Sequence, residues 1–246
     1  MPSDIRLSVI IPAYDEEARL PGTLRQVGAF LAAQPYDSEV LVVDDGSKDG
    51  TAAAVGRCTA VAMLRLIHHP DGGNHGKGAS VRRGMMEARG AFRLFMDADN
   101  STTIDQIAAL WPWFEQGYDV VIGSRRTPGA RVEVHQAWYK ELAGRLGNLV
   151  IRALAVPGVE DTQAGFKMFT SRAAAAVFPL QTLDRWGSDF EVLAIARLLG
   201  FRIREVPIVW INAPGSKVKL SSYPQVLREV WRVRRNLKSG RYLRPS

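Results

Sequence analysis

The feature that most constrains the fold of this sequence is a regular alternation of short apolar runs with longer segments of helical periodicity. The apolar runs, which we predict to be strands, are residues 7–12, 39–43, 61–67, 91–96 and 119–123. The segments that we predict to be helices are residues 21–33, 48–58 (with Ser47 as the cap), 76–89 and 104–116. This alternation predicts an α/β fold with a doubly wound, mostly parallel sheet and helices on both faces.

Acidic residues follow three of the predicted strands. Asp97 and Asp99 come directly after the fourth, Asp44 and Asp45 follow the second, and residues 15–17 follow the first. The carboxyl ends of parallel strands share one edge of a sheet, where open α/β proteins bind ligands. Because carboxylates there can hold Mg²⁺ or Mn²⁺ together with substrate phosphates, we predict a divalent metal site at Asp97 and Asp99. Solvated turns are the alternative interpretation of the same residues.

The loops after the strands exclude two common nucleotide-binding folds. A dinucleotide-binding fold needs a glycine-rich turn after its first strand, whereas residues 12–16 read Pro-Ala-Tyr-Asp-Glu. A Walker phosphate loop needs Gly-x4-Gly-Lys followed by Ser or Thr. Gly72 and Gly76 are one residue too close for that loop, and Gly78 follows Lys77. The predicted nucleotide site is therefore of another type.

The same edge offers contacts to a nucleotide base. Tyr14 can stack on a base, and the Asp44 carboxylate can accept an N–H of uracil or guanine. Residues 44–47 (Asp-Asp-Gly-Ser) also suit a simple strand-to-helix turn, because all three residue types form turns. The base-binding interpretation depends on the neighbouring acidic strand ends.

The composition narrows the class of protein. The 246 residues are 46% hydrophobic, enough for a globular core, and the net charge of +7 favours an anionic partner. We expect no membrane-spanning helix, since no run of about 18 apolar residues occurs, and no signal peptide. Cys58 is the single cysteine, which excludes an intrachain disulfide and fits a cytoplasmic location.

Longer motifs resemble a known enzyme family. The segments that resemble family 2 inverting glycosyltransferases with the GT-A fold are residues 9–17, 42–51, 74–84 and 97–99. The segments that resemble its dolichyl-phosphate β-glucosyltransferase branch are residues 123–125, 161–169, 185–191 and 210–217. Asp15 departs from the family pattern, which usually has asparagine there, and Ala164 stands where eukaryotic members usually have cysteine. Eukaryotic members also carry an N-terminal membrane anchor, for which we expect no counterpart.

The resemblance implies an inverting transfer of a hexose with a divalent metal, Mg²⁺ or Mn²⁺. It implies glucose from UDP-glucose as the donor, a polyprenyl phosphate of the dolichyl type as the acceptor and a β-linked product. A polyprenyl-phosphate mannose synthase that uses GDP-mannose is one alternative, and a family 2 transferase with a soluble acceptor is another. A basic, non-catalytic anion-binding protein is a distant alternative, because it leaves the acidic strand ends unexplained. Nucleic acid is not an expected partner.

The resemblance also assigns roles to individual residues. The predicted nucleotide-sugar site is Pro12, Ala13, Tyr14, Glu16, Asp44, Gly46, Ser47, Lys77, Asp97, Ala98 and Asp99. The predicted catalytic residues are Asp99, Arg125, Asp161 and Lys167. The predicted acceptor or sugar contacts are Arg125, Arg131, Gln163, Lys167, Trp186, Asp189 and Lys217, with Glu191 beside Asp189.

Two of these roles have open alternatives. A phosphate monoester is mostly dianionic at neutral pH, so it needs cations and positioning more than a base. Asp161 is therefore expected either to act as a base or only to orient the acceptor. Asp189 is expected either to bind sugar hydroxyls or to cap the start of a helix.

We expect a single catalytic domain at residues 1–222, with a Rossmann-like nucleotide-sugar-binding half at 5–123 and an acceptor-binding half at 124–222. Residues 223–246 are predicted to form a basic amphipathic helix and tail. Such a helix lies on an anionic membrane or packs against the domain. The expected location is the cytoplasm, with peripheral contact at the cytoplasmic face of a membrane.

Overall fold

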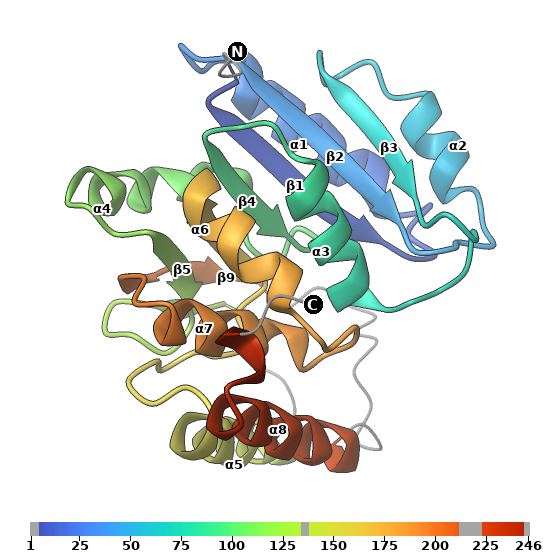
Figure 1. Ribbon diagram of the computed structural model, residues 1–246. Helices are drawn as coiled ribbons and strands as arrows, with labels where there is room; N and C mark the ends of the chain where they lie inside the picture. Colours follow the sequence, from blue (N-terminus) through green and yellow to red (C-terminus); the bar gives the residue numbers. More distant parts are fainter. Residues whose placement is uncertain (1–4, 134–137, 212–222, 244–246) are drawn as a thin grey trace.

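A computed structural model describes residues 5–133, 138–211 and 223–243 of the chain. Its centre is a seven-stranded sheet in the order β3-β2-β1-β4-β7-β5-β8 (Figure 1). The strands are β1 (Leu7–Ala13), β2 (Ser38–Asp44), β3 (Leu64–His68), β4 (Phe92–Met96), β5 (Val120–Ser124), β7 (Phe166–Thr170) and β8 (Ile203–Pro207). A second, parallel pair is formed by β6 (Arg131–Val132) and β9 (Val209–Trp210).

One strand breaks the parallel pattern of the large sheet. Strand β7 lies between β4 and β5 and runs antiparallel to both. Its residue Lys167 is in register with Phe95 of β4 and with Ile122 of β5. The start of β7 therefore lies at the edge where the parallel strands end, and the loop before it enters the same region.

Helices cover both faces of the sheet. The α-helices of the described residues are α1 (Leu20–Ala32), α2 (Thr51–Gly56), α3 (Lys77–Glu87), α4 (Trp111–Glu115), α5 (Trp138–Leu154), α6 (Ser171–Val177), α7 (Ser188–Leu198) and α8 (Tyr223–Lys238). Short 3₁₀ helices occur at Ile104–Ala109, Phe178–Leu180 and Arg241–Leu243. None of the described helices is long and apolar enough to cross a membrane.

Alternate strand residues supply two separate cores, which confirms the doubly wound prediction. Leu7, Val9 and Ile11 of β1 belong to the core on the face of α1, whereas Ile10 belongs to the core on the face of α3. All four side chains are fully buried. Because successive side chains of a strand point to opposite faces, a sheet buried on both sides reads as a continuous apolar run.

Two predicted helices differ from the observed ones. Helix α2 begins at Thr51 rather than at Lys48, and Ser47 makes no helix cap because its hydroxyl is bonded to Asp44. The predicted helix at 104–116 is divided into a 3₁₀ helix and α4. Pro112 explains the division, since it has no N–H to donate to the preceding turn and suits the first turn of a new helix.

Candidate active site

The predicted nucleotide residues meet at one edge of the sheet. Strands β2, β1 and β4 are neighbours and parallel, and the register pairs Ala13 at the end of β1 with Asp44 at the end of β2. Asp97, Ala98 and Asp99 follow β4 directly. Ala98 is buried, and its carbonyl accepts a hydrogen bond of 2.7 Å from the Thr23 hydroxyl of α1. This contact fixes the backbone between the two carboxylates.

Most acids at the first two strand ends hold neighbouring loops. The Asp15 carboxylate accepts the amide of Lys48 at 2.8 Å, and the Glu17 carboxylate accepts the amide of Gly50 at 2.9 Å. The Glu16 carboxylate is paired with Arg19 at 2.7 Å. Backbone amides and an arginine therefore already satisfy the acids of this loop, so these carboxylates do not depend on a bound ligand to offset their charge.

The backbone at Asp15 explains why an aspartate suits this position. Its φ is +48°, a left-handed conformation in which asparagine and aspartate are the best tolerated residues after glycine. The contact to the Lys48 amide needs only one side-chain oxygen, which asparagine also has. The departure from the family pattern thus keeps both the backbone conformation and the contact.

The strand end at Asp44 forms a tight turn. Its carboxylate accepts the Ser47 amide at 3.0 Å and the Ser47 hydroxyl, and the Ser47 hydroxyl accepts the Asp15 amide at 3.0 Å. Gly46 has a φ of +75°, and a Cβ there would lie 2.8 Å from the carbonyl oxygen of Gly72. The turn alternative is therefore real, and it leaves the second oxygen of Asp44 facing His68 at 3.3 Å.

The glycine-rich loop at 72–78 is held against the same edge by Asp45. The Asp45 carboxylate accepts the amides of His75 at 2.8 Å and Gly76 at 2.9 Å. A Cβ on Gly78 would lie 2.5 Å from the side chain of Ser188, so this glycine lets the start of α3 approach the start of α7. That approach brings Lys77, the first residue of α3, next to Asp189.

Two lysines and two aspartates form a charge network in which Lys167 and Asp189 are buried, whereas the side chains of Lys77 and Asp97 are 19% and 39% exposed. Lys77 Nζ lies 2.7 Å from Asp97 and 3.4 Å from Asp189, and Lys167 Nζ lies 2.9 Å from Asp189. Burial disfavours the charged form of Lys77, but the carboxylates of Asp189 and Asp97 outweigh it and raise its pKa. Asp189 is in the first turn of α7, yet its carboxylate is bonded to lysines rather than capping the helix.

Lys167 has no solvent exposure. Its ammonium donates to Asp189 and to the carbonyl of Ala164, and it lies 5.1 Å from the centre of the Phe95 ring. Burial lowers the pKa of Lys167 in spite of the Asp189 charge. In this geometry the fully buried Lys167 ammonium holds the Asp189 carboxylate, and its predicted roles in catalysis and acceptor binding stay predictions.

A second ion pair joins the loop before β7 to the end of β5. The Asp161 carboxylate accepts three hydrogen bonds from Arg125: the backbone amide at 3.0 Å, Nε at 2.8 Å and Nη2 at 2.8 Å. Burial raises the pKa of Asp161, but the Arg125 charge outweighs it and holds the pKa at about 2. The Arg125 side chain is 29% exposed and lies 5.5 Å from the centre of the Trp210 ring, so its outer side faces solvent.

The Arg125 pair and the lysine network belong to one cluster. The charges of both Asp97 and Asp189 help to raise the pKa of Arg125, although its burial opposes them. A Cβ on Gly165 would lie 1.9 Å from an Asp97 oxygen, so the loop before β7 packs directly on Asp97. The loop and strand ends thus form one surface that combines cations with carboxylates.

Sequence reasoning missed two residues that hold this loop. Glu205 of β8 accepts the amide of Asp161 at 2.9 Å, and it also accepts the amide of Glu160. Asn148 of α5 accepts the Thr162 hydroxyl at 2.8 Å and donates to the carbonyl of Glu160 at 2.7 Å. Neither residue lies in a recognisable motif, and only their positions in the fold bring them to the loop.

Glu191 corrects one expectation. It is fully buried and accepts hydrogen bonds from the Leu183 amide at 2.7 Å, the Thr182 hydroxyl at 2.6 Å and the Tyr242 hydroxyl at 2.7 Å. The expectation that Glu191 binds sugar hydroxyls is therefore wrong, because its oxygens are used inside the protein.

The remaining predicted acceptor residues are not joined to the cluster by any contact that the structure gives. Arg131 begins the outer pair β6–β9 and is exposed. Gln163 and Trp186 are half-buried in the loops before β7 and α7. Lys217 lies outside the described residues. For these four residues the predicted roles stay predictions.

The two carboxylates after β4 fit a divalent cation. Asp99 uses one oxygen to accept the Ser101 amide at 3.0 Å, and the Asp97 carboxylate already faces a cation, the Lys77 ammonium. Among the described residues there is no group of three or more His, Cys, Asp or Glu side chains arranged to hold a metal alone. Two carboxylates completed by substrate phosphates are a usual Mg²⁺ site, so the residues present suit a metal that arrives with a diphosphate.

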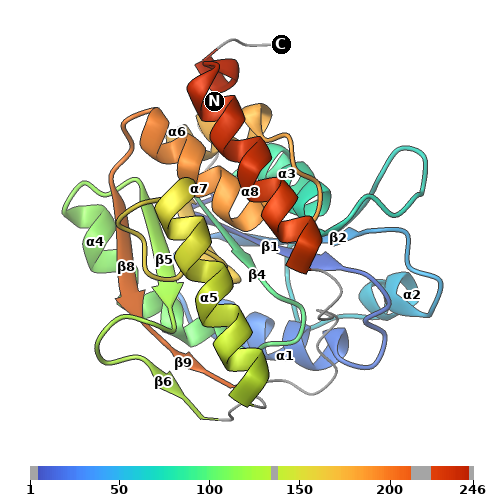
Figure 2. The same ribbon diagram turned by 90° about the horizontal axis from the view of Figure 1, so that it is seen from below.

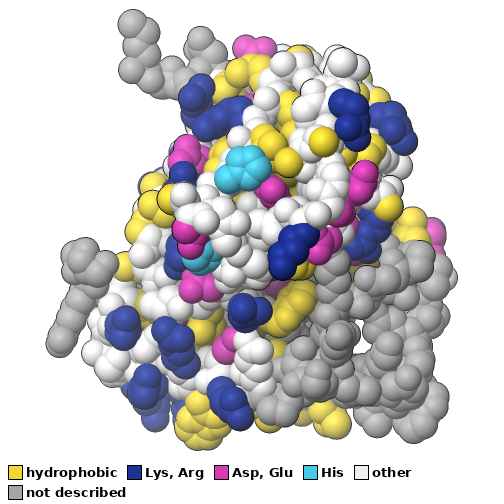
Figure 3. All heavy atoms as spheres, turned by 90° about the vertical axis from the view of Figure 1, so that its right-hand side faces the viewer, with side chains coloured by type: hydrophobic (Ala, Val, Ile, Leu, Met, Phe, Trp, Pro, Cys, Tyr) yellow, Lys and Arg dark blue, Asp and Glu magenta, His cyan; other side chains and the backbone are white. Residues whose placement is uncertain are grey.

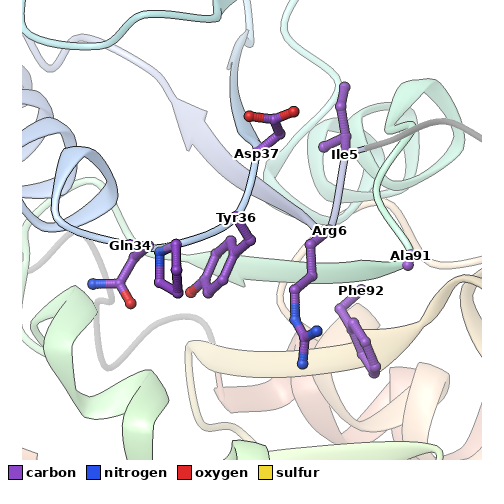
Figure 4. Close-up of a pocket in the computed structure, with 8 residues that line it drawn as sticks. Ile5, Arg6, Gln34, Tyr36, Asp37, Ala91 and Phe92 are labelled. Atoms are coloured by element: carbon purple, nitrogen blue, oxygen red, sulfur yellow. The ribbon is translucent and has the colours of Figure 1, made fainter.

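A surface pocket of about 630 Å³ lies elsewhere (Figure 4). Its lining comes from the residues at the start of β1 and β4 and from residues 34–37 between α1 and β2, at the end of the sheet opposite to the acidic strand ends. The Arg6 guanidinium there lies 5.0 Å from the centre of the Trp111 ring and 5.6 Å from that of Tyr36. We treat these contacts as packing, since the pocket is remote from the charge cluster.

Comparison with known proteins agrees with this geometry. The profile of Glycosyl transferase family 2 matches residues 8–170. The chain belongs to glycosyl transferase family 2. The match begins in β1 and ends with the last residue of β7, so it includes both carboxylates after β4 and the Asp161 loop.

Named relatives of this family 2 chain cover most of its length. It is 33% identical over 240 residues to "Dolichyl-phosphate beta-glucosyltransferase ALG5D" of Trichomonas vaginalis, which covers 93% of this chain and 73% of that protein. It is 32% identical over 231 residues to the dolichyl-phosphate beta-glucosyltransferase of Homo sapiens, with coverage of 87% and 69%. The resemblance to this branch of the family is therefore confirmed.

Solved structures confirm the GT-A fold of this family 2 enzyme. Mannosyl-3-phosphoglycerate synthase from Rubrobacter xylanophilus matches with a TM-score of 0.71 at 20% identity, over 96% of this chain and 75% of that one. Glucosyl-3-phosphoglycerate synthase from Mycobacterium tuberculosis, in complex with Mn²⁺, UDP-glucose and phosphoglyceric acid, matches with a TM-score of 0.67 at 17% identity, over 94% and 80%.

Proposed function

We propose that this enzyme transfers glucose from UDP-glucose onto a polyprenyl phosphate of the dolichyl type, with inversion at the anomeric carbon. The relatives named dolichyl-phosphate beta-glucosyltransferase support the acceptor and the sugar. The solved neighbour that contains Mn²⁺ and UDP-glucose supports a nucleotide-sugar donor and a divalent cation. The reaction takes place at the cytoplasmic face of a membrane, which the protein contacts peripherally.

The arrangement of Arg125 and Asp161 carries the proposal. A sugar hydroxyl must lose a proton to attack, whereas a phosphate monoester is mostly dianionic at neutral pH. The pKa of Asp161 is about 2, and both of its oxygens are occupied by Arg125, which makes it a weak base at neutral pH. The site therefore offers an oriented, partly exposed guanidinium for an anionic acceptor instead of a base for a neutral one.

The remaining residues divide between the donor and the reacting groups. We assign Tyr14 and Asp44 at the first two strand ends to the base, and the carboxylates after β4 would hold a divalent cation, which would stabilise the charge of the departing diphosphate. An oxygen of the acceptor phosphate attacks the anomeric carbon as the bond to the diphosphate breaks on the opposite side. One displacement of this kind converts an α-linked donor into a β-linked product.

The test is transfer of radiolabel from UDP-glucose into an organic-extractable product. The assay contains polyprenyl phosphate in detergent and Mg²⁺ or Mn²⁺, with Asp99→Asn as the active-site variant. Asp105→Asn is the matched control, because Asp105 is an exposed acid six residues away in the next helix. We expect the Asp99 variant to lose about 10²–10³ in rate, which is typical for the loss of a group that stabilises developing charge, and the control to be unaffected.

The outcomes separate the donor from the acceptor. Label that requires the lipid, the metal and Asp99 supports the proposal, and competition by unlabelled GDP-mannose then tests the choice of sugar. UDP release with a soluble acceptor, but no label in the lipid extract, would be consistent with the family but would contradict a lipid phosphate as the acceptor. Equal loss in the Asp99 and Asp105 variants would contradict the role of the carboxylates after β4.

A further inference from the structure

Helices α5 and α8 lie side by side on one face of the molecule. They are in contact with each other, at the bottom of Figure 1 and nearest to the viewer in Figure 2. Val230 and Val233 of α8 and Ile151 of α5 are fully buried against the core. Both helices therefore pack one side against the core and present the opposite side to solvent. Packing against the domain, one of the two alternatives expected for α8, thus leaves an outer face of this helix exposed.

The outer sides of these two helices carry large apolar side chains. Leu146 and Leu149 of α5 are 58% and 59% exposed, and Leu227 and Trp231 of α8 are 46% and 63% exposed. They make up half of the eight large hydrophobic side chains that are exposed within the described residues. The spacings of three and four residues place each pair on one side of its helix. Exposed large apolar side chains on two neighbouring helices are typical of an interaction surface.

The apolar residues of α8 are surrounded by positive charge. Arg228, Arg232, Arg235 and Lys238 are exposed on the same helix, and the Arg234 guanidinium lies 5.9 Å from the centre of the Trp231 ring. Lys and Arg side chains also gather in the lower part of Figure 3, with hydrophobic side chains along its lower edge.

The acid of α8 does not balance this charge. Glu229 is only partly exposed, it accepts a hydrogen bond of 2.9 Å from Gln225, and a Cβ on Gly187 would lie 2.6 Å from its carboxylate. It therefore faces the start of α7 rather than solvent. Every exposed side chain of α8 within its described residues 225–238 is apolar or basic, and none of them is acidic.

We propose that the outer face of α5 and α8 docks on an anionic phospholipid surface. Tryptophan and leucine enter the boundary between headgroups and acyl chains, while arginine and lysine beside them contact lipid phosphates. A second copy of the chain is disfavoured as the occupant, because it would bring two sets of arginines together. Nucleic acid would leave the four apolar side chains without a partner.

The docked face is connected to the candidate active site through α5. Asn148 lies between the two exposed leucines in sequence, points inward and is 4% exposed. It holds the loop at Glu160 and Thr162, on either side of Asp161. A helix that rests on the lipid surface thus also fixes the loop that orients Arg125. This link between docking and the active-site loop rests on the proposed function, whereas the binding of vesicles does not.

The test is co-sedimentation of the full chain with phosphatidylcholine vesicles, with and without phosphatidylserine. The apolar variant is Leu227→Ser with Trp231→Ser, and the charge variant is Arg228→Gln with Arg232→Gln. The control is Met86→Ser, which removes a side chain of 58% exposure on α3. All of the substituted side chains are exposed, so we expect each variant to fold. Circular dichroism and urea unfolding verify this.

We expect binding only to vesicles that contain phosphatidylserine, and weaker binding at high salt. Each arginine removed should weaken binding by about fivefold, the apolar variant should lose most binding, and the control should bind normally. Equal binding of the two double variants and the control would overturn the proposal. A dimer mass in solution for the wild-type chain and a monomer mass for the apolar variant would also overturn it, because the face would then join two copies.

A parallel assay separates this proposal from the proposed function. Transfer to a short-chain, water-soluble polyprenyl phosphate does not require a membrane, so the docking variants should retain it. If the wild-type chain binds vesicles but transfers nothing to either acceptor, the docking face stands and the proposed function fails. If it transfers glucose to the soluble acceptor but does not bind vesicles, the proposed function stands and the docking face fails.

Discussion

Replacement of Asp161 by asparagine tests whether this residue orients Arg125 or acts as a base. The variant keeps the shape of the side chain but removes the charge that holds the guanidinium through contacts of 2.8 Å. If Asp161 only positions Arg125, the rate should fall by up to about 10²-fold, as for a misplaced binding group, and the pH profile should keep its shape. Loss of a general base would instead remove the acidic limb of the profile.

The structure also gives a magnitude for stability. The pKa of Asp161 falls from 3.8 to about 2 on folding, and its side chain is 1% exposed. At 1.36 kcal/mol for each pKa unit, the ion pair contributes about 2 kcal/mol to the free energy of unfolding. Because the folded pKa is the lower one, this contribution is complete above pH 4 to 5 and is lost as the pH falls toward about 2. The exposure of Arg125 limits the loss in the variant, since water can solvate the released guanidinium.

The assay is urea unfolding of wild type and Asp161→Asn at neutral and at acidic pH. We expect a difference of about 2 kcal/mol at pH 7 that shrinks below pH 4. Arg125→Gln and the double variant complete a cycle, in which the two substitutions should be strongly non-additive in both rate and stability. Additive effects, or a stability difference that does not change with pH, would refute the reasoning.

Three further predictions concern Gly165 and Lys77 in the cluster and Tyr242 outside it. Gly165→Ala should push the Asp97 carboxylate aside, since its Cβ would lie 1.9 Å from an Asp97 oxygen, and should lower metal-dependent transfer while the circular dichroism spectrum stays unchanged. Lys77→Met should strengthen Mn²⁺ binding without nucleotide by about fivefold, because a charge 2.7 Å from Asp97 is removed; calorimetric titration measures it, and equal affinity would count against competition at Asp97. Tyr242→Phe should lower the free energy of unfolding by about 1 kcal/mol in urea and leave transfer intact, since the lost hydroxyl donates to the buried Glu191 and accepts from Asn236, both remote from the reacting groups.

The sequence sufficed for the layout of the sheet and for the position of its ligand edge. Strands β1, β2 and β4 are mostly buried on both faces, so each appears as a mainly apolar run, and the acids at or after their ends mark where each one ends. Asp97 and Asp99 could be placed at the sheet edge for that reason. The family pattern added Arg125 and Asp161, which the structure brings into direct contact.

The sequence did not show which polar residues face one another. Asp189 and Glu191 are two residues apart on α7, yet one joins the lysines of the site and the other bonds to Tyr242 at the end of the chain. Asn148 and Glu205 reach the Asp161 loop from elements that carry no motif. These contacts depend on how distant elements pack, which local periodicity does not encode.

Strand β7 has a consequence for the order in which the chain is assembled. It pairs with β4 on one side and β5 on the other, and both strands are synthesised well before it. Until residue 170 has left the ribosome, β4 has a bare edge and β5 has no neighbour in the sheet, since β8 comes later still. Bare strand edges are templates for aggregation, and late, non-local pairing is slow. A nascent chain halted between β5 and β7 is therefore the species that most needs a chaperone, and a fragment cut there is a poor candidate for independent expression.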